Sequence, residues 1–275
     1  MRFAICNETF QDWPFDKAFA FAAELGYTGL EIAPFTINVN AYDISSATRS
    51  AVRKQADDAG LEIIGLHWLL AKTTGYYLTT PDDTVRHKTA DYLCELARLC
   101  RDLGGHLMVL GSPAQRNLLP GVTHPQAIEL AADCLRRAMP TLEELAVTLA
   151  VEPLGPKDGN FLLSAELGRQ LCEMVGSPCC RLHLDCKAMA SESKPIPQII
   201  RENARLLEHF HANDPNLRGP GMGALDFAPI FQALAEIDYR GWVSVEVFDY
   251  APGVEALAGD SIEYMHDCLA RLANG

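Results

Sequence analysis

The sequence predicts an α/β fold, a single (β/α)8 TIM barrel that occupies residues 1–275 as one domain. Short apolar runs alternate eight times with amphipathic stretches, at intervals of about 26 to 44 residues, which is the repeat of a strand followed by a helix. No early strand is followed by the glycine-rich phosphate loop that an open doubly wound sheet usually carries. No low-complexity linker divides the chain, so one closed barrel is the simplest interpretation.

The expected strands are short runs of mostly β-branched and other apolar residues, which suit parallel strands that are buried on both faces. They are Arg2–Cys6, Thr28–Ile32, Glu62–His67, His106–Leu110, Val147–Glu152, Arg181–Cys186, Glu208–Asn213 and Trp242–Val247.

The expected helices carry start and stop signals of their own. Gly26 and Gly60 follow the first two, because glycine readily takes the left-handed conformation that ends a helix. Pro140 is expected to interrupt the fourth helix, and Thr141 with Glu144 forms a capping box that restarts it. The expected helices are Pro14–Leu25, Ser46–Ala59, Asp82–Leu103, His124–Ala146, Ser164–Val175, Pro197–Leu206, Ala228–Ile237 and Ser261–Leu272.

Charge and composition exclude several classes of protein. The chain has 23 Lys and Arg against 36 Asp and Glu, a net charge of −13, so we expect neither a nucleic acid nor a membrane as a partner. No run approaches the roughly 18 apolar residues of a membrane span, and the start MRFAICNETF is typical of a strand rather than a leader. Nine cysteines without a Cys-x-x-Cys pair favour free buried thiols, so we expect a cytoplasmic protein.

Four ionisable residues are expected at the same end of the barrel. Side chains alternate between the lumen and the helix layer along a barrel strand, and active sites lie at the carboxyl ends of the strands. In the fifth expected strand the apolar residues share one face, which places Glu152 in the lumen. The same count places Asp185, His211 and Glu246 inward at the ends of the sixth, seventh and eighth strands.

Three carboxylates and one imidazole at one barrel mouth indicate a cation, because buried carboxylates repel one another. The spacings of 33, 26 and 35 residues are one repeat each, so adjacent strands would surround one ion. Oxygen ligands with one imidazole suit Mn2+, Mg2+ or Co2+, and Zn2+ stays open. A divalent ion leaves about one net negative charge, which favours a neutral polyol as the ligand.

The sequence resembles a known superfamily in the segments AVEPLGPKDGNF, LHLDCKAM, HFHANDPNLRGPGMGALDF and GWVSVEVF. These are similar to the xylose isomerase-like sugar isomerases and epimerases, and most similar to the ketose 3-epimerase branch, which acts on D-tagatose and D-psicose. The resemblance covers essentially the whole chain. It includes the ordered Glu, Asp, His, Glu tetrad and the Gly-Pro-Gly-x-Gly loop that follows the His.

The resemblance implies that Glu152, Asp185, His211 and Glu246 bind a divalent metal ion and that Glu152 and Glu246 are also the acid/base pair. A metal ion that polarises a carbonyl stabilises an enediolate, so one carboxylate removes the α proton and the other returns a proton on the opposite face. We therefore expect a metal-dependent epimerase or isomerase whose small-molecule substrate is a ketose, a keto-sugar or a related polyol.

One position departs from the ketose 3-epimerases. They carry a substrate-binding His three residues after the sixth-strand Asp, where this sequence has Ala188, preceded by Lys187. Either Lys187 supplies the missing donor or the substrate is held differently. Arg218, in the loop after the seventh strand, matches the family's substrate-contacting Arg.

Further candidates lie at or near other strand ends. His183 and His209 lie one layer deeper than the tetrad, where we expect them to support Asp185 and His211. Trp68 is a candidate wall for a sugar, because sugars stack their C–H faces on aromatic rings. The remaining substrate-binding candidates are Glu31, His67, Arg116 and Asn160.

Three alternative functions stay open. A lyase or dehydratase would use the same metal ion and enolate but expel a β-substituent from a keto-sugar or 3-keto-glycoside, and Ala188 slightly favours it. A hydrolase of abasic DNA would need more His and Glu ligands and a basic face. A barrel that only binds metal or sugar would not need the acid/base pair. Since barrels of this size often pair through their helices, we also expect a homo-oligomer, a dimer or tetramer.

Overall fold

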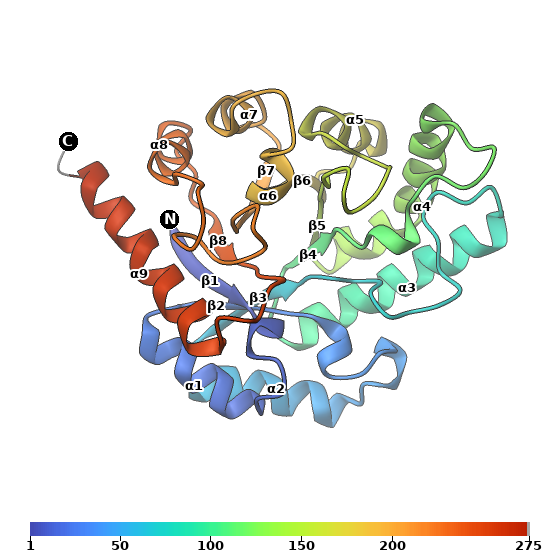
Figure 1. Cartoon of the computed structure of the whole chain (residues 1–275). Coiled ribbons are helices and arrows are strands. Elements are labelled where there is room, and N and C mark those ends of the chain that lie inside the picture. The colour runs from blue at the N-terminus through green and yellow to red at the C-terminus, as the bar shows by residue number, and fades with distance from the viewer. Residues whose placement is uncertain (274–275) are drawn as a thin grey trace.

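The computed structural model describes residues 1–273, in which eight parallel strands form a closed barrel in sequence order (Figure 1). The predicted (β/α)8 fold is therefore confirmed. β1 closes the barrel by pairing with β8, with Ile5 opposite Val245. The strands are β1 (Arg2–Cys6), β2 (Gly29–Ile32), β3 (Glu62–Leu66), β4 (Leu107–Leu110), β5 (Thr148–Val151), β6 (Cys180–Asp185), β7 (Leu207–Ala212) and β8 (Trp242–Val245).

The helices surround these strands, as Figure 1 shows, and their apolar faces pack against the outer face of the barrel. Within the described residues they are α1 (Phe15–Leu25), α2 (Ser46–Asp58), α3 (Asp83–Asp102), α4 (His124–Glu144), α5 (Ala165–Val175), α6 (Cys186–Met189), α7 (Ile196–Glu202), α8 (Ala228–Glu236) and α9 (Val254–Ala273). Short 3-10 turns follow β1, β2 and β4, at Asn7–Phe10, Pro34–Thr36 and Pro113–Gln115. A fourth, Ala41–Asp43, precedes α2.

The amino-terminal end of the barrel lumen is closed by the Trp242 side chain, which packs in a buried cluster with Ala4 and Ile64. Glycine at position 29 makes room for it, because a Cβ there would lie 2.7 Å from the indole ring. The Arg2 guanidinium lies 3.9 Å from the centre of the same ring. The lumen is thus filled by apolar side chains at this end, and its buried ionisable residues lie toward the carboxyl ends of the strands.

The predicted break in the fourth helix is wrong. α4 runs from His124 to Glu144 and contains Pro140, so Thr141 caps no new helix. Proline removes one backbone donor and crowds the preceding turn. Tertiary packing outweighs this cost here, because Met139 and Leu142, on either side of the exposed Pro140, are buried against the core.

Other helices also differ from the expected ones, and α7 ends at Glu202 rather than Leu206. α9 begins at Val254 rather than Ser261. The short α6 follows β6 without a loop, because the Asp185 side chain accepts a hydrogen bond from the Ala188 backbone N–H at 2.7 Å and so caps the turn. This cap fixes Asp185 at the point where the strand ends.

All nine cysteines are free, and seven of them are buried, in agreement with the sequence. Among the helices of residues 1–273, none combines the length and the apolar character that crossing a membrane requires.

We predict that Trp242→Ala lowers the free energy of unfolding by about 3–5 kcal/mol, because it leaves a large cavity in the lumen. Urea denaturation followed by circular dichroism measures the loss. Val39→Ala, at a residue that is 46% exposed, is the matched control and should change stability by less than about 0.5 kcal/mol. Equal losses in the two variants would contradict the role of Trp242 as the plug of the lumen.

Candidate active site

The four residues that the sequence places at strand ends are brought together at the carboxyl end of the barrel. Glu152 directly follows β5, Asp185 ends β6, His211 lies in β7 and Glu246 directly follows β8. All four are buried. Donor atoms of Glu152, Asp185 and His211, with His183, all lie within 4.8 Å of one another. Oε2 of Glu246 lies 3.1 Å from Nδ1 of His211, which joins the fourth residue to this group.

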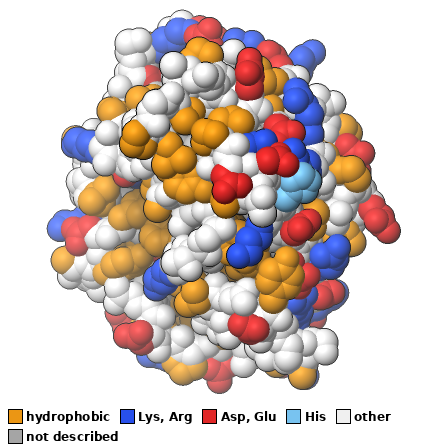
Figure 2. All heavy atoms as spheres, turned by 90° about the vertical axis from the view of Figure 1, so that its right-hand side faces the viewer, with side chains coloured by type: hydrophobic (Ala, Val, Ile, Leu, Met, Phe, Trp, Pro, Cys, Tyr) orange, Lys and Arg blue, Asp and Glu red, His pale blue; other side chains and the backbone are white. Residues whose placement is uncertain are grey.

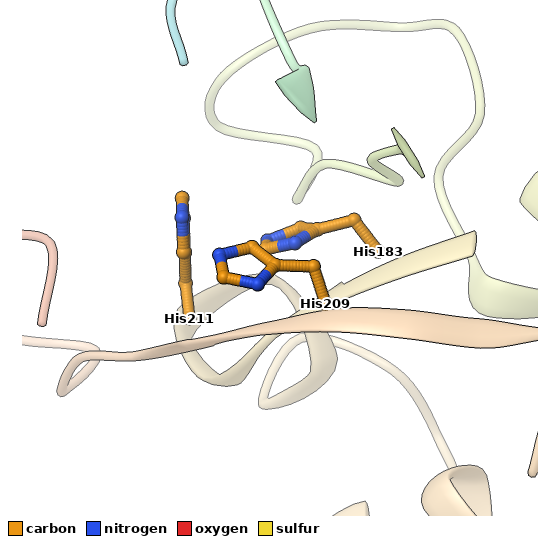
Figure 3. Close-up of side chains that lie close together, drawn as sticks. All are labelled: His183, His209 and His211. Carbon is orange, nitrogen blue, oxygen red and sulfur yellow. The ribbon is translucent and has the colours of Figure 1, made fainter. Parts of the chain in front are cut away.

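Three histidines from the neighbouring strands β6 and β7, His183, His209 and His211, lie close together, as Figure 3 shows. The ring of His183 meets that of His211 edge-on, with centroids 4.2 Å apart, and His209 lies 5.2 Å from His211. His183 therefore packs against His211 and makes no hydrogen bond to Asp185 among the described residues. Its donor atom also lies close enough to Glu152 and Asp185 to share a ligand.

Glu31 lies below the tetrad rather than in the substrate cavity. Its carboxylate contacts Nε2 of His211 at 3.1 and 3.2 Å and Nε2 of His209 at 2.6 Å. The side chain is fully buried. Because Glu31 holds Nε2 of His211, the other ring nitrogen, Nδ1, faces the carboxylates of the site.

Glu246 is held from two sides. The indole N–H of Trp68 donates a hydrogen bond of 2.7 Å to Oε1, and His211 contacts Oε2. The Trp68 backbone has a positive φ of 51°, which is uncommon for a residue of this size. Its ring stacks on Phe248, with centroids 5.9 Å apart.

Close backbone and side-chain contacts hold the Glu152 and Asp185 carboxylates in place. A Cβ on Gly111 would lie 1.7 Å from Oε2 of Glu152, so only glycine leaves room for this carboxylate. Oδ2 of Asp185 accepts a hydrogen bond of 2.5 Å from the Asn213 side chain, while Oδ1 accepts from Ala188.

The pKa values of Glu152 and Glu246 are shifted in opposite directions. Burial and the negative charges of Glu246 and Asp185 raise the pKa of Glu152 to about 8. Burial also acts to raise the pKa of Glu246, but the charge and hydrogen bond of His211 outweigh it and lower that pKa below its usual value. Burial lowers the pKa of His211, yet Glu31 and Glu246 raise it well above its usual value. At neutral pH the metal-free site thus pairs a protonated Glu152 with an ionised Glu246.

This donor set fits a divalent cation. Within residues 1–273 no Lys or Arg side chain forms a salt bridge with Glu152, Asp185 or Glu246, although all three carboxyl groups are buried. A buried carboxylate is costly unless it is paired, and hard divalent ions prefer carboxylate oxygen with an occasional imidazole.

A cavity of about 410 Å3 lies beside Glu152 and Glu246. The stacked rings of Trp68 and Phe248 form part of its apolar wall. This volume lies within the range of about 300–1,000 Å3 that is usual for small-molecule sites. The polar residues that line it besides the two glutamates are Lys72, Ser112, Gln115, Asp158 and Lys187.

Of the substrate-binding candidates, Lys187 lines this cavity. Its ammonium group donates a hydrogen bond of 2.7 Å to Asp158 and lies 4.6 Å from the centre of the Phe248 ring. Arg218 lies in the loop between β7 and α8, is 39% exposed and pairs with Asp249 at 2.8 Å.

The other candidates lie outside the cavity lining. His67 is buried and contacts the carboxylate of Glu8 at 2.5 Å. Arg116 is buried, and its guanidinium donates to the Leu110 carbonyl at 3.1 Å. The Asn160 side chain accepts a hydrogen bond of 2.7 Å from the Leu118 backbone and so joins two loops.

Sequence reasoning missed the contacts that position the tetrad. Glu8 was not singled out, because it lies two residues beyond the first expected strand and its contact with His67 leaves no local pattern. Trp68 was expected only as a wall, and its bond to Glu246 carries no sequence signature. Asn213 lies two residues after His211 and so on the same side of the seventh expected strand, which accounts for its bond to Asp185.

Acidic and basic side chains are interspersed on the face shown in Figure 2, where hydrophobic side chains also gather in patches. The surplus of acidic residues therefore does not form one continuous acidic surface on this face.

The closed barrel carries a cluster of buried ionisable residues at the carboxyl ends of its strands, where barrel enzymes have their active sites. The model of the xylose isomerase-like TIM barrel family matches residues 19–268, so the chain belongs to that family. A probable ketose 3-epimerase of Synechocystis is 25% identical over 91% of this chain and 89% of its own length.

Two solved structures show the same fold. D-psicose 3-epimerase with D-tagatose from Clostridium cellulolyticum is similar with a TM-score of 0.85 and 20% identity, over 98% of this chain and 99% of that one. 3-Keto-D-glucoside 4-epimerase from E. coli has a TM-score of 0.84 and 19% identity, over 98% of this chain and all of the other. The predicted family and its ketose 3-epimerase relatives are confirmed, and these relatives are epimerases, a class of isomerase.

We predict that Glu152→Gln stabilises the metal-free protein increasingly as the pH rises from about 4.5 to 8. In this window the folded chain keeps a proton on Glu152 that the unfolded chain has lost, because the pKa rises from 4.5 to about 8 on folding. The free energy of unfolding of the natural protein therefore falls with pH, and Gln removes this fall. Urea titrations in EDTA at pH 5, 6.5 and 8 measure the difference. Glu144→Gln, at an exposed helix position, is the control, and a pH-independent difference for Glu152→Gln would refute the shift.

Proposed function

We propose that this protein is a divalent-metal-dependent epimerase or isomerase that acts on a ketose, a keto-sugar or a related polyol. One observation carries the proposal: Glu152 and Glu246 border the same cavity, beside Asp185 and His211, and their pKa values are shifted in opposite directions. The activities named for the relatives support the class of substrate.

Glu152, Asp185, His211 and Glu246 would hold the ion. Mn2+, Mg2+ or Co2+ suits three carboxylates and one imidazole, and Zn2+ is also accepted by such a set. A bound divalent ion polarises the substrate carbonyl and so makes the neighbouring C–H group more acidic.

The two glutamates move the proton. Glu246 is ionised and fixed by Trp68 and His211, so it removes the proton α to the carbonyl. Glu152 lies in surroundings that favour proton uptake, as its raised pKa indicates, and it returns a solvent-exchanged proton to the opposite face of the same carbon. In the reverse direction the two glutamates exchange roles.

The cavity lining orients the sugar. The stacked rings of Trp68 and Phe248 offer an apolar surface to the C–H face of a sugar. Lys187 offers hydrogen bonds to hydroxyl groups, in place of the His that ketose 3-epimerases carry at the position of Ala188. Arg218, in the loop after β7, is proposed to contact the far end of the substrate.

The remaining candidates do not line the cavity, so we propose supporting roles for them. Glu31 orients His211 from below, as its two contacts to Nε2 of that ring support. Arg116 lies in the buried interior next to β4, and Asn160 joins two loops. A homo-oligomer in the cytoplasm stays a prediction, and light scattering of the purified chain tests the oligomeric part.

Glu246→Gln and Glu152→Gln should each lower turnover by about 10²- to 10⁴-fold, because each removes one proton-transfer group. The assay incubates the Mn2+-loaded protein with D-psicose, D-tagatose and a 3-keto-glucoside in D2O and follows epimer formation and deuterium at the α carbon by NMR. Treatment with EDTA should abolish the reaction and Mn2+ should restore it. Glu144→Gln is the control that keeps full turnover.

Retained turnover in both glutamine variants would rule out the acid/base pair. Release of the aglycone from the 3-keto-glucoside, with no epimer formed, would contradict the epimerase proposal and support the lyase alternative. Deuterium at the α carbon without either product would show proton abstraction on a substrate whose stereochemistry the site does not invert, and would contradict the epimerase assignment for that sugar.

A further inference from the structure

We propose a second cation site at the same barrel mouth, formed by Cys6, Glu8, His67 and Glu246. Donor atoms of these four side chains all lie within 4.8 Å of one another, and all four residues are buried. Cys6 ends β1, Glu8 lies in the 3-10 turn that follows, and His67 directly follows β3. The barrel closure brings them beside the end of β8, where Glu246 lies.

This site is distinct from the tetrad, with which it shares Glu246 alone. The tetrad uses β5 to β8, whereas Cys6, Glu8 and His67 come from the β1 and β3 side of the barrel. Glu246 lies between the two groups, with Oε2 next to His211 and Oε1 next to the Trp68 indole. A carboxylate has two oxygens with several lone pairs, so it can bridge two ions.

Two unpartnered polar atoms point to a ligand at this place. Oε1 of Glu8 and Nδ1 of His67 are buried and have no hydrogen-bond partner, while Oε2 of Glu8 contacts Nε2 of His67 at 2.5 Å. A buried polar atom without a partner costs about 1–3 kcal/mol. Within residues 1–273 no Lys or Arg side chain forms a salt bridge with Glu8. A cation would satisfy the group as a whole.

The donor types indicate which cation. One thiol sulfur, one imidazole nitrogen and two carboxylate oxygens form a mixed set that suits Zn2+, whereas the tetrad is richer in oxygen and suits Mn2+. Binding would displace the proton of the Cys6 thiol, because the thiolate is the form that binds metal ions. The competing occupant is a proton shared by Glu8 and His67, which needs no metal.

The test counts metal ions on the full chain. Mn2+-loaded protein is dialysed against a small excess of Zn2+ and then against metal-free buffer, and total Mn and Zn per chain are measured by mass spectrometry. We expect two ions per chain, and one in Glu8→Gln and in His67→Asn. Asp185→Asn should also retain one ion per chain, because it loses the ion of the tetrad and keeps the ion of the second site. Circular dichroism confirms that each variant is folded, and Glu144→Gln is the control with two ions.

A zinc X-ray absorption spectrum identifies the site directly. It should show a sulfur neighbour at about 2.3 Å, which disappears in Cys6→Ser. One ion per chain in the natural protein, or two in folded Glu8→Gln and His67→Asn, would overturn the proposal. These counts do not depend on turnover, so they stand apart from the success or failure of the proposed sugar chemistry.

Discussion

The convergence of buried carboxylates on His211 is the interaction on which the rest of this site depends. His211 contacts Glu31 through one ring nitrogen and Glu246 through the other. The charges of Glu31 and Glu246 raise the pKa of His211 well above its usual value, whereas Glu152 and Asp185 form no salt bridge with a Lys or Arg side chain within residues 1–273. Several buried carboxylates can lie this close together only when protons or a cation neutralise part of their charge. Metal binding and protonation of Glu152 therefore compete with each other.

The barrel provides the rigid frame for this arrangement. Parallel strands deliver the ends of β5, β6, β7 and β8 to one mouth, while Trp242 fills the opposite end of the lumen. Backbone features then set the final positions, because Gly111 leaves room for the Glu152 carboxylate and the Asp185 side chain caps α6. A site built from strand ends in this way can be more precise than one built from loops alone.

Much of the fold and the tetrad was predictable from the sequence, for a physical reason. Successive side chains along a strand point to opposite faces, so counting residues along β5 and β6 was enough to place Glu152 and Asp185 on the lumen side. This alternation does not fix how deep in the lumen a side chain lies. Glu31 was therefore expected to contact the substrate, but it lies beneath His211. Contacts between strands far apart in sequence, such as Trp68 with Glu246, follow from barrel closure and leave no local pattern. The break expected at Pro140 failed because packing outweighed local propensity.

Proton release on Mn2+ binding tests the central claim most directly. A bound ion takes the place of protons on Glu152 and His211: burial and neighbouring carboxylates raise the pKa of Glu152 to about 8, while Glu31 and Glu246 raise the pKa of His211 well above its usual value against the effect of burial. Calorimetric titration at pH 7, in two buffers that differ in ionisation enthalpy, should give between about one and two protons released per Mn2+ bound. Tight Mn2+ binding without proton release would contradict the account.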